Sequence, residues 1–443
     1  MNLKVCLIFL AAICLYPFKG VGQSHYSVNG KIFDVDQVNK QVKFLMQEVG
    51  VPGLSVVVIN NGKIVFSKGY GYLDLHSKHL QKVNRRTKFV AASLSKSFVV
   101  YAAYQLIAQG LIQLDTPMYK YLEYDLLRHD ERYKLITPRM VLSHTSGIEN
   151  NIDQNVKDQV DIIAQPGTAY TYSGEGYVYL SKVIEKIRNK PIEQILKEEV
   201  YQPLKLKDTY TTSVGKANIN HAAAHDQFGR HMERWKNTKP FIMSHIHTTA
   251  VDYARLLLSV FDYKHIDKSL IDVMLTPQIL IEDEKKYGPG FELNFGANDT
   301  LVLQGGDCDG FKGLGLYSIK NKSGFVYFGN SERSEKIGSK LCEVTTGMDI
   351  KRCFSRVYDN QYPSEANDVF KAYIQEGAPA AKALVDKKLL GEVPKMFTMT
   401  DMIELVYYLK DDNYELAKYI ATEYFKKCPD CDGKMVFKRW LNK

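Results

Sequence analysis

The chain has 443 residues, enough for one large domain and an appendage. It is 45% hydrophobic and 24% charged, with 29 Tyr and 20 Phe, a composition that excludes an intrinsically disordered protein. The net charge of +8 is mild and no run of Lys and Arg forms a stripe, which gives nucleic-acid binding little support.

The N-terminus has the pattern of a secretory signal peptide. Lys4 precedes an apolar run at 5–18, and small residues follow at 20–22. The run is shorter than the roughly 20 residues that span a bilayer, although an uncleaved anchor is the alternative. We expect residues 1–22 to be removed and the protein to be exported, periplasmic or extracellular, with no transmembrane segment remaining.

Residues 54–70 predict a β-hairpin, because two apolar runs flank Asn61-Gly62, the strongest short hairpin signal. Helical patterns then dominate from Ser93 to Leu206. The first of them runs from Ser93 through Gln109, and another spans 177–188.

Strand patterns return late in the chain, at 300–304, 313–319 and 324–328. Strands at both ends around a helical middle predict an α+β fold. Its antiparallel sheet is formed by both ends of the domain, is flanked by helices and carries an inserted helical subdomain. A groove between the sheet and the subdomain is the natural place for a site.

After about Glu343 the pattern changes to helices at 402–409 and 417–424 around a turn. This pair resembles a tetratricopeptide repeat, but one repeat is too few for a solenoid, so we expect a helical cap packed on the main domain. The predicted organisation is a signal peptide at 1–22, a main domain at 23–343, a linker at 344–363 and a helical C-terminal region at 364–443.

Five cysteines remain outside the signal peptide, so at least one thiol is free or pairs between chains. They are Cys308, Cys342, Cys353, Cys428 and Cys431. Cys428-Pro-Asp-Cys431 has the spacing of a redox motif, yet no βαβ pattern surrounds it. We expect a helix-end turn there, with a local disulfide as an option, rather than a redox centre.

Ser93 and Lys96 form an S-x-x-K motif at the start of the first long helical pattern. Three residues are about one helical turn, so both side chains share a face. A serine hydroxyl becomes a good nucleophile when a neighbouring base takes its proton, and lysine can be that base. Ser213 and Lys216 have the same spacing but lie in a predicted loop, and a helix cap is the alternative role for Ser93.

Further motifs follow in a fixed order, and together they resemble the class C β-lactamase-like serine hydrolases, related to penicillin-binding proteins. The resemblance covers about 42–341. Its motifs are Val51-Pro-Gly, Gly69-Tyr-Gly, Ala-Ala-Ser93-Leu-Ser-Lys96, Leu114-Asp-Thr-Pro117, Ile136-Thr-Pro-Arg139, His144-Thr-Ser-Gly147, Pro166-Gly-Thr, Tyr172-Ser-Gly-Glu-Gly176 and Gln304-Gly-Gly-Asp307.

The resemblance implies that Ser93 is the acylated serine and that Lys96 is its neighbouring base. Tyr172 resembles the tyrosine of the family's Y-x-N motif, which shares the proton transfer; its alternative role is that of a half-buried core aromatic. Position 174 departs from the motif, because Gly174 replaces an asparagine whose amide would hold the substrate or the lysine.

Gln304-Gly305-Gly306 resembles the K-T-G strand on the other side of the cleft. Gln304 replaces the lysine and Gly305 the threonine, so recognition of a substrate carboxylate is in doubt. The resemblance places the oxyanion hole at the backbone N–H groups of Ser93 and Asp307. A strand end or bulge is the alternative explanation for the two glycines.

Other motifs indicate no second catalytic or metal site. His144 belongs to a structural turn of the family and is not expected to be a triad base. His245 and His247 lack a third metal ligand, so they are expected to tune the cleft, and no metal or cofactor is implied. The sequence contains neither G-x-S-x-G nor H-E-x-x-H, the motifs of α/β-hydrolases and zincins.

The sequence therefore predicts a serine hydrolase that forms an acyl-enzyme on a small ester, amide or peptide substrate, which includes cell-wall fragments. An esterase or a D-amino-acid-specific peptidase fits better than a true β-lactamase, because Gln304 and Gly174 depart from the family pattern. The alternative is a non-catalytic sensor or wall-binding protein that retains the fold. Intact Ser93, Lys96 and Tyr172 argue against that alternative.

Overall fold

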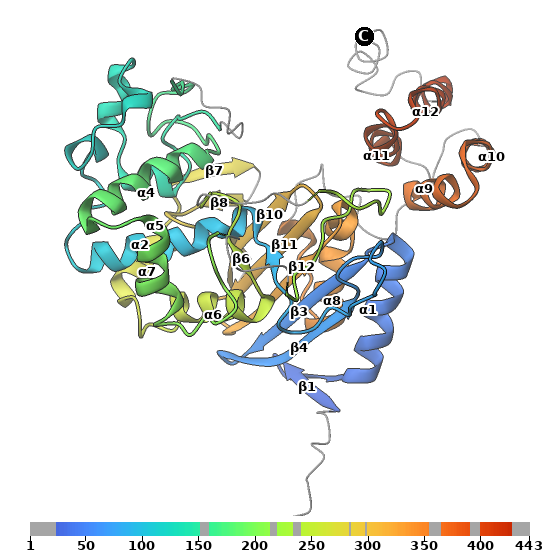
Figure 1. Ribbon diagram of the computed structural model, residues 1–443, viewed down its shortest axis with the longest axis horizontal. Helices are drawn as coiled ribbons and strands as arrows, with labels where there is room; N and C mark the ends of the chain where they lie inside the picture. Colours follow the sequence, from blue (N-terminus) through green and yellow to red (C-terminus); the bar gives the residue numbers. More distant parts are fainter. Residues whose placement is uncertain are drawn as a thin grey trace, which may run out of the picture.

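A computed structural model describes residues 24–150, 159–212, 219–233, 241–282, 285–296, 299–353, 365–389 and 399–427. Its largest feature is an antiparallel sheet of eight strands, in the order β4-β3-β12-β11-β10-β9-β8-β7, with helices on both faces (Figure 1). The predicted α+β class is confirmed. The strands are β3 (Gly53–Asn60), β4 (Lys63–Gly71), β7 (Ile279–Glu282), β8 (Lys285–Tyr287), β9 (Glu292–Phe295), β10 (Thr300–Cys308), β11 (Phe311–Ser318) and β12 (Ser323–Gly329).

The predicted hairpin is formed by β3 and β4, and its turn residues Asn61 and Gly62 both have positive φ, of 49° and 69°. Positive φ at both central residues is what a tight two-residue turn requires. β3 also pairs with β12, with Val57 opposite Val326. The two ends of the domain thus close one sheet, as the sequence predicts.

β3 is buried on both faces, and alternate residues face different helices. Leu54, Val56 and Val58 pack in one apolar cluster with α1 (Val35–Val49) and α8 (Gly338–Thr346). Val57 and Ile59 belong to a second cluster with α6 (Ala250–Phe261) and the helical subdomain. A strand covered on both faces has a continuous apolar run instead of an alternating one, which is the pattern seen here.

The helical subdomain lies between two short strands, β5 (Phe89–Val90) and β6 (His247–Thr248), which pair with each other. The predicted helix from Ser93 to Gln109 is divided into a 3₁₀ turn, η1 (Ala92–Ser95), and α2 (Lys96–Ala108). The subdomain also contains α3 (Pro138–Leu142), α4 (Gly174–Arg188), α5 (Ile192–Leu196) and η5 (Lys197–Tyr201), with α7 (Lys268–Met274) following α6.

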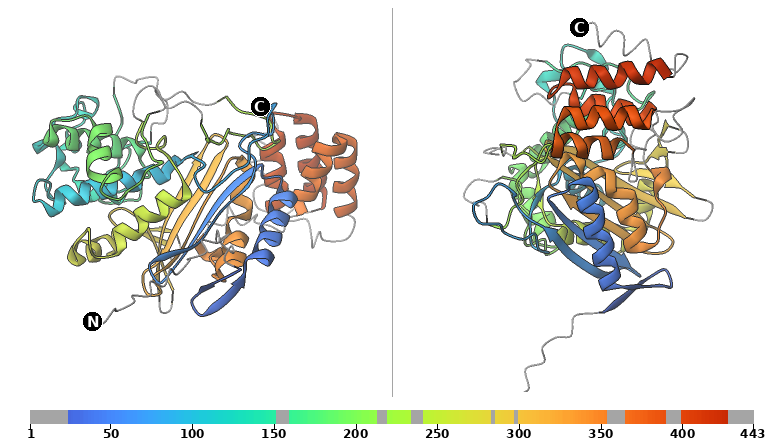
Figure 2. Two further views of the ribbon diagram at one scale, coloured as in Figure 1. Left: turned by 60° about the horizontal axis from the view of Figure 1, so that its bottom comes forward. Right: turned by 90° about the vertical axis from the view of Figure 1, so that its right-hand side faces the viewer.

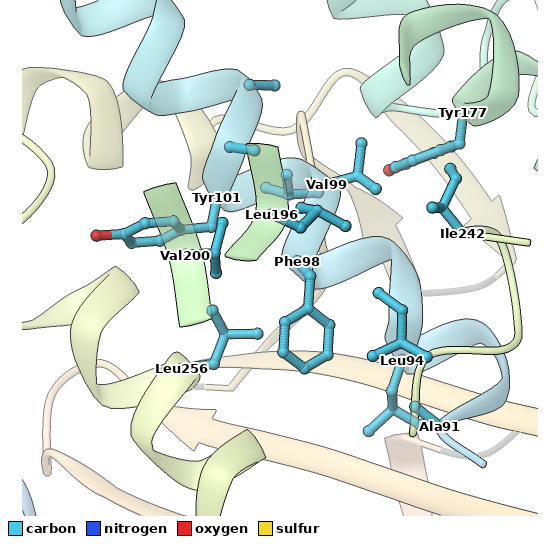
Figure 3. Packing of buried hydrophobic residues seen from close by; sticks show 14 of the residues in the cluster. Ala91, Leu94, Phe98, Val99, Tyr101, Tyr177, Leu196, Val200, Ile242 and Leu256 are labelled. Carbon is cyan, nitrogen blue, oxygen red and sulfur yellow. The ribbon is translucent and has the colours of Figure 1, made fainter. Parts of the chain in front are cut away.

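α2 is the central helix of the subdomain, and most of its residues are buried. Figure 3 shows side chains of η1 and α2, among them Leu94 and Phe98, in one cluster with Val200 of η5 and Leu256 of α6 (Figure 3). A helix that is apolar on all sides is stable only when it is covered on all sides. This packing fixes the start of α2, where Lys96 lies.

The main domain extends beyond its predicted boundary, because α8 continues past Glu343 and both Ile350 and Cys353 belong to an apolar cluster under the sheet. Four helices follow: α9 (Glu365–Glu376), α10 (Ala378–Lys388), α11 (Met399–Leu409) and α12 (Tyr414–Lys427). They share their own apolar cluster and lie against one end of the main domain (Figure 2). Their likeness to a tetratricopeptide pair stays a prediction.

Buried polar contacts join these helices to the main domain. Arg333 donates to the Asn367 side chain and stacks 4.4 Å from the centre of the Phe370 ring. Lys336 forms a buried ion pair with Glu404. Asn367 also donates to the carbonyl of Glu48, at 2.7 Å. The C-terminal helices are therefore packed on the main domain through paired groups.

Three predictions concern residues outside the described ranges: the signal peptide, the Ser213–Lys216 motif, and the pair Cys428 and Cys431. Of the other three cysteines, Cys308 and Cys342 are free thiols. In the part of the chain that the structure describes, no helix is both long and apolar enough to cross a membrane.

Candidate active site

Ser93 lies in η1, at the point where the chain leaves β5 and enters the helical subdomain. The preceding residue, Ala92, is buried with φ of 49°, a conformation that costs a residue with a side chain about 1 to 2 kcal/mol. Hydrogen bonds hold this turn: Ala91 N–H donates to the Ile246 carbonyl at 2.8 Å, and Ile246 N–H donates to Ser95 Oγ at 3.1 Å. Ser95 is thus engaged in holding the turn that carries Ser93.

Three predicted residues meet within hydrogen-bond distance. Lys96 Nζ lies 3.1 Å from Ser93 Oγ, and Tyr172 OH lies 2.6 Å from the same oxygen. Lys96 is 2% exposed and also donates to the carbonyl of Met243, at 2.9 Å. The lysine amine lies 4.9 Å from the centre of the Tyr172 ring. The hydroxyl of Ser93 therefore contacts two groups that can exchange a proton with it.

His144 fixes the position of Tyr172 through hydrogen bonds to the residues directly before and after it. Its carbonyl accepts from Thr171 N–H at 2.7 Å, its Nδ1 accepts from Ser173 N–H at 3.1 Å, and the ring centres of His144 and Tyr172 are 4.4 Å apart. Complete burial, and next the charge of Lys96, hold the pKa of His144 well below its usual range. A neutral ring that accepts at Nδ1 fits a structural role, as expected for this motif. The contacts of His144 with Tyr172 and its two neighbours were not predicted from the sequence.

Gly306 allows β10 to pass directly against η1. A Cβ atom at this position would lie 2.2 Å from Leu94 Cδ1 and 2.7 Å from the carbonyl oxygen of Ala91. The close approach brings the backbone near Asp307 to the same cleft as Ser93. An oxyanion hole formed by the backbone N–H groups of Ser93 and Asp307 stays a prediction.

Gln304 and Gly305 lie on the same strand and differ in their packing. The Gln304 amide is buried: its oxygen accepts from Tyr287 OH at 3.1 Å, and its nitrogen donates to the Gly305 carbonyl at 3.0 Å. No atom lies within 4 Å of where a Gly305 Cβ would stand. The absent threonine thus leaves open space in the wall of the cleft.

Two other basic groups near the cleft offer no unpaired charge. Lys312 is buried and forms ion pairs with Asp307 and with Glu332, the latter at 2.6 Å. Burial works against its charge, but the two carboxylates outweigh burial and raise the pKa of Lys312. Burial lowers the pKa of His245 to about 4, so this ring is neutral at pH 7.

His245 and His247 do not form a metal site with other described residues, among which no group of three or more His, Cys, Asp or Glu side chains has a suitable arrangement. His247 Nδ1 lies 2.8 Å from His221 Nε2 in a buried pair, whereas His245 lines the cleft. The two histidines therefore have separate surroundings.

The space at position 174 is filled by two side chains that sequence analysis missed. A Cβ on Gly174 would lie 2.4 Å from Met243 Sδ and 3.3 Å from Asn150 Oδ1. Asn150 Oδ1 accepts from Gly174 N–H at 2.9 Å. Sequence offered no signal for either residue, because Asn150 and Met243 come from separate loops on either side of Gly174 in the chain.

These residues surround a cleft of about 770 Å³ between the helical subdomain and β10. Ser93, Lys96 and Tyr172 line one side of it, and Gln304 to Asp307 line the other. Glu292 also lines it, and burial raises the pKa of this carboxyl to about 7. A cleft of this size accepts a small substrate.

Comparison with known proteins identifies the family of the chain. Residues 38–340 match the family described as Beta-lactamase. The chain is 28% identical over 317 residues to PbpX of Bacillus subtilis (strain 168), which is named as a penicillin-binding protein; the match covers 68% of this chain and 76% of PbpX. It is 23% identical over 363 residues to Protein flp of Staphylococcus aureus (strain MW2), covering 75% and 70% of the two chains.

Two solved structures share the fold. One is the octameric penicillin-binding protein homologue from Pyrococcus abyssi, with a TM-score of 0.62 and 22% identity over 72% of this chain and 79% of that one. The other is the D-alanine carboxypeptidase AmpC from Burkholderia cenocepacia, with a TM-score of 0.61 and 17% identity over 70% and 98%. At these identities the likeness shows the architecture alone.

Proposed function

This chain belongs to the β-lactamase family of serine hydrolases, and from that premise we propose that it hydrolyses small esters or amides through an acyl-enzyme on Ser93. One observation carries the proposal: Ser93 Oγ lies within 3.1 Å of Lys96 Nζ and 2.6 Å of Tyr172 OH in an open cleft. A nucleophile, two proton-transfer partners and a place for substrate are the minimum for acyl transfer.

In the proposed reaction, Lys96 and Tyr172 together take the proton of Ser93 as its Oγ attacks the carbonyl carbon. The backbone N–H groups of Ser93 and Asp307 donate to the oxyanion, and each such donor contributes about 3 kcal/mol. The tetrahedral intermediate collapses, and the leaving alcohol or amine receives the proton. Water then attacks the acyl carbon, which releases the acid and returns the proton to Ser93.

Neutral substrates fit this cleft better than carboxylates do. The lysine of the family motif is replaced by Gln304, and the charge of Lys312 is balanced by Asp307 and Glu332. We therefore favour an esterase, or a peptidase for D-amino-acid substrates, over a β-lactamase. The N-terminal pattern further supports export, which N-terminal sequencing of the mature protein would test by a start at Gln23.

The decisive experiment is intact-mass spectrometry after exposure to a fluorophosphonate, followed by peptide mapping. We expect one adduct, on Ser93, and none in Ser93→Ala. An adduct on Ser95 or Ser213, or one that survives in Ser93→Ala, would overturn the assignment. A folded wild-type protein that forms no adduct and turns over no ester would favour the non-catalytic alternative.

A further inference from the structure

The turn between β10 and β11 is held by one carboxylate from a later part of the chain. Asp307 and Lys312 lie opposite each other in the two strands, and Gly310 lies in the turn between them. Glu332 accepts a hydrogen bond from the Gly310 N–H, and its other oxygen lies 2.6 Å from Lys312 Nζ. Lys312 also pairs with the Asp307 side chain. One carboxylate thus fixes both the turn and the lysine that pairs with Asp307.

Glu332 is the better shielded of the two partners of Lys312. The Lys312 side chain is 7% exposed, that of Glu332 is 23% exposed, and that of Asp307 is 57% exposed. Water screens the more exposed pair more strongly, and an ammonium that is taken out of water needs a close partner. Loss of Glu332 would therefore displace Lys312 and, with it, the segment of β10 that contains Asp307.

Glu332 is the first residue of η6, the 3₁₀ turn that follows β12 and ends at Ile337. The C-terminal helices contact other residues of the same turn. Arg333 donates to the Asn367 side chain of α9, and Lys336 forms its ion pair with α11. Both basic side chains are buried. η6 thus contacts the turn between β10 and β11 through its first residue and the C-terminal helices through the residues that follow.

A neighbouring loop makes the same connection. A Cβ atom on Gly310 would lie 2.8 Å from the backbone nitrogen of His225, so the turn packs directly against this loop. The carbonyl of His225 accepts from the Glu332 N–H, at 3.2 Å. Three residues later, the Phe228 ring stacks on the Phe370 ring of α9, with centres 5.3 Å apart. The loop, η6 and α9 therefore pack together behind the turn.

We propose that Glu332 is a positioning residue for acyl transfer at Ser93, and that it depends on the C-terminal helices to hold η6 in place. The proposal rests on the proposed function, because it uses the Asp307 N–H as a donor to the oxyanion. Of the described residues in this cluster, Asp307 and Lys312 line the cleft and Glu332 does not, so Glu332 acts through them. A donor works only when it is aimed at the developing charge, so displacement of β10 lowers the rate more than it weakens substrate binding.

The test measures kcat and KM separately for p-nitrophenyl acetate, with Ser93→Ala as the blank. Glu332→Ala removes both contacts with the turn. Glu332→Gln keeps an acceptor for the Gly310 N–H, so it should recover part of the kcat that Glu332→Ala loses. A role in stability alone would change the thermal midpoint of unfolding, which is measured for each variant, and would leave kcat of the folded protein unchanged.

A second variant tests the dependence on the C-terminal helices. Asn367→Ala removes the side chain to which Arg333 donates, outside the cleft. Glu365→Gln is the matched control, because Glu365 forms its ion pair with Lys388 between α9 and α10. The control weakens a contact within the C-terminal helices and leaves the contacts of η6 in place.

We expect kcat of Glu332→Ala to fall about tenfold to a hundredfold with KM nearly unchanged, because an oxyanion donor is displaced and not removed. In Asn367→Ala we expect kcat to fall about threefold to tenfold, and in Glu365→Gln to stay at the wild-type value. Wild-type kcat in folded Glu332→Ala or Asn367→Ala, or an equal loss in Glu365→Gln, would overturn the proposal. If one of the two alanine variants does not fold, the other decides against the control. A wild type without Ser93-dependent turnover would instead overturn the proposed function, and this proposal with it.

Discussion

Ser93, Lys96 and Tyr172 come from two segments about 80 residues apart, and their contacts depend on how each segment ends. Lys96 begins α2 directly after the η1 turn, so its side chain returns to Ser93 within one turn. Tyr172 is fixed by the hydrogen bonds that His144 makes to Thr171 and Ser173. Spacing alone could predict the first contact, whereas the second needed the family motif because sequence distance carries no information on it.

Lys96→Ala is expected to lower kcat/KM by about 10² to 10⁴, the usual contribution of a general base. Lys96→Met, which keeps most of the side-chain volume, is the matched variant for separating catalysis from packing. Steady-state hydrolysis of a neutral ester and thermal unfolding would be measured for both. Near-normal turnover in a folded Lys96→Met protein would show that Lys96 is dispensable.

Gln304→Lys is expected to shift the preference toward carboxylate substrates. Charge-assisted hydrogen bonds are roughly twice as strong as neutral ones, so a partly buried lysine here should improve carboxylate recognition about tenfold. The readout is the rate of Ser93 acylation by benzylpenicillin relative to its neutral methyl ester. Gln304→Met is the control, because it changes the same site without adding charge. Rapid hydrolysis of benzylpenicillin by the wild type, insensitive to salt, would refute our interpretation of position 304.

His245 predicts a dependence of stability on pH. Burial lowers the pKa of its ring to about 4, so between pH 4 and the ordinary value near 6.5 only the unfolded chain binds the proton. The stabilisation is complete above pH 6.5 and is lost as pH falls toward 4. From pH 7.5 to 5 this group should remove about 1 to 2 kcal/mol from the free energy of unfolding. Urea unfolding at pH 7.5 and pH 5 should show a smaller loss of unfolding free energy for His245→Gln than for the wild type. Equal losses in the two proteins would contradict the prediction.

At the scale of elements, long apolar runs were predictable and short polar strands were not. The hairpin of β3 and β4 and the strands β10 to β12 follow from their apolar runs and the Asn61-Gly62 turn. The strands β7 to β9 were missed, because they have four residues or fewer and include charged ones such as Lys285 and Glu292. The turn before Ser93 was also missed, since nothing in the sequence indicates the positive φ of 49° at Ala92.

The contact of β10 with η1 gives a prediction for two adjacent glycines. Gly306→Ala would place a methyl group against Leu94 and the Ala91 carbonyl, so it should lower the free energy of unfolding by about 1 to 3 kcal/mol. The methyl group of Gly305→Ala would face open space, so this variant should change the free energy of unfolding by less than about 0.5 kcal/mol. Chemical denaturation of both variants measures the difference. Equal destabilisation would mean that β10 does not approach η1 as described.

At the scale of the whole molecule, the C-terminal helices were predictable as helices, but their mode of attachment was not. Helical spacing of apolar residues indicates α11 and α12, and nothing in it identifies a partner. The attachment depends on Arg333 and Lys336, which follow the last strand and whose partners, Asn367 and Glu404, lie 34 and 68 residues later. Such pairs become visible only when both segments are placed in space.

Truncation after Tyr362 should lower the thermal midpoint of the main domain. It would uncover Arg333 and Lys336 and remove the Phe370 ring that covers the arginine. Differential scanning calorimetry should give one transition for the full chain and an earlier one for the truncated protein. An unchanged midpoint, together with a C-terminal fragment that folds alone, would show that the helices are a separate module.

The pairing of β3 with β12 sets the order of events in folding. Val57 cannot meet Val326 until nearly the entire domain has left the ribosome, so the sheet that supports Ser93 is completed late in synthesis. Contacts so distant in sequence belong to topologies of high contact order, which fold slowly. The nucleophile of such a chain is assembled only after the last strand of the sheet has been made.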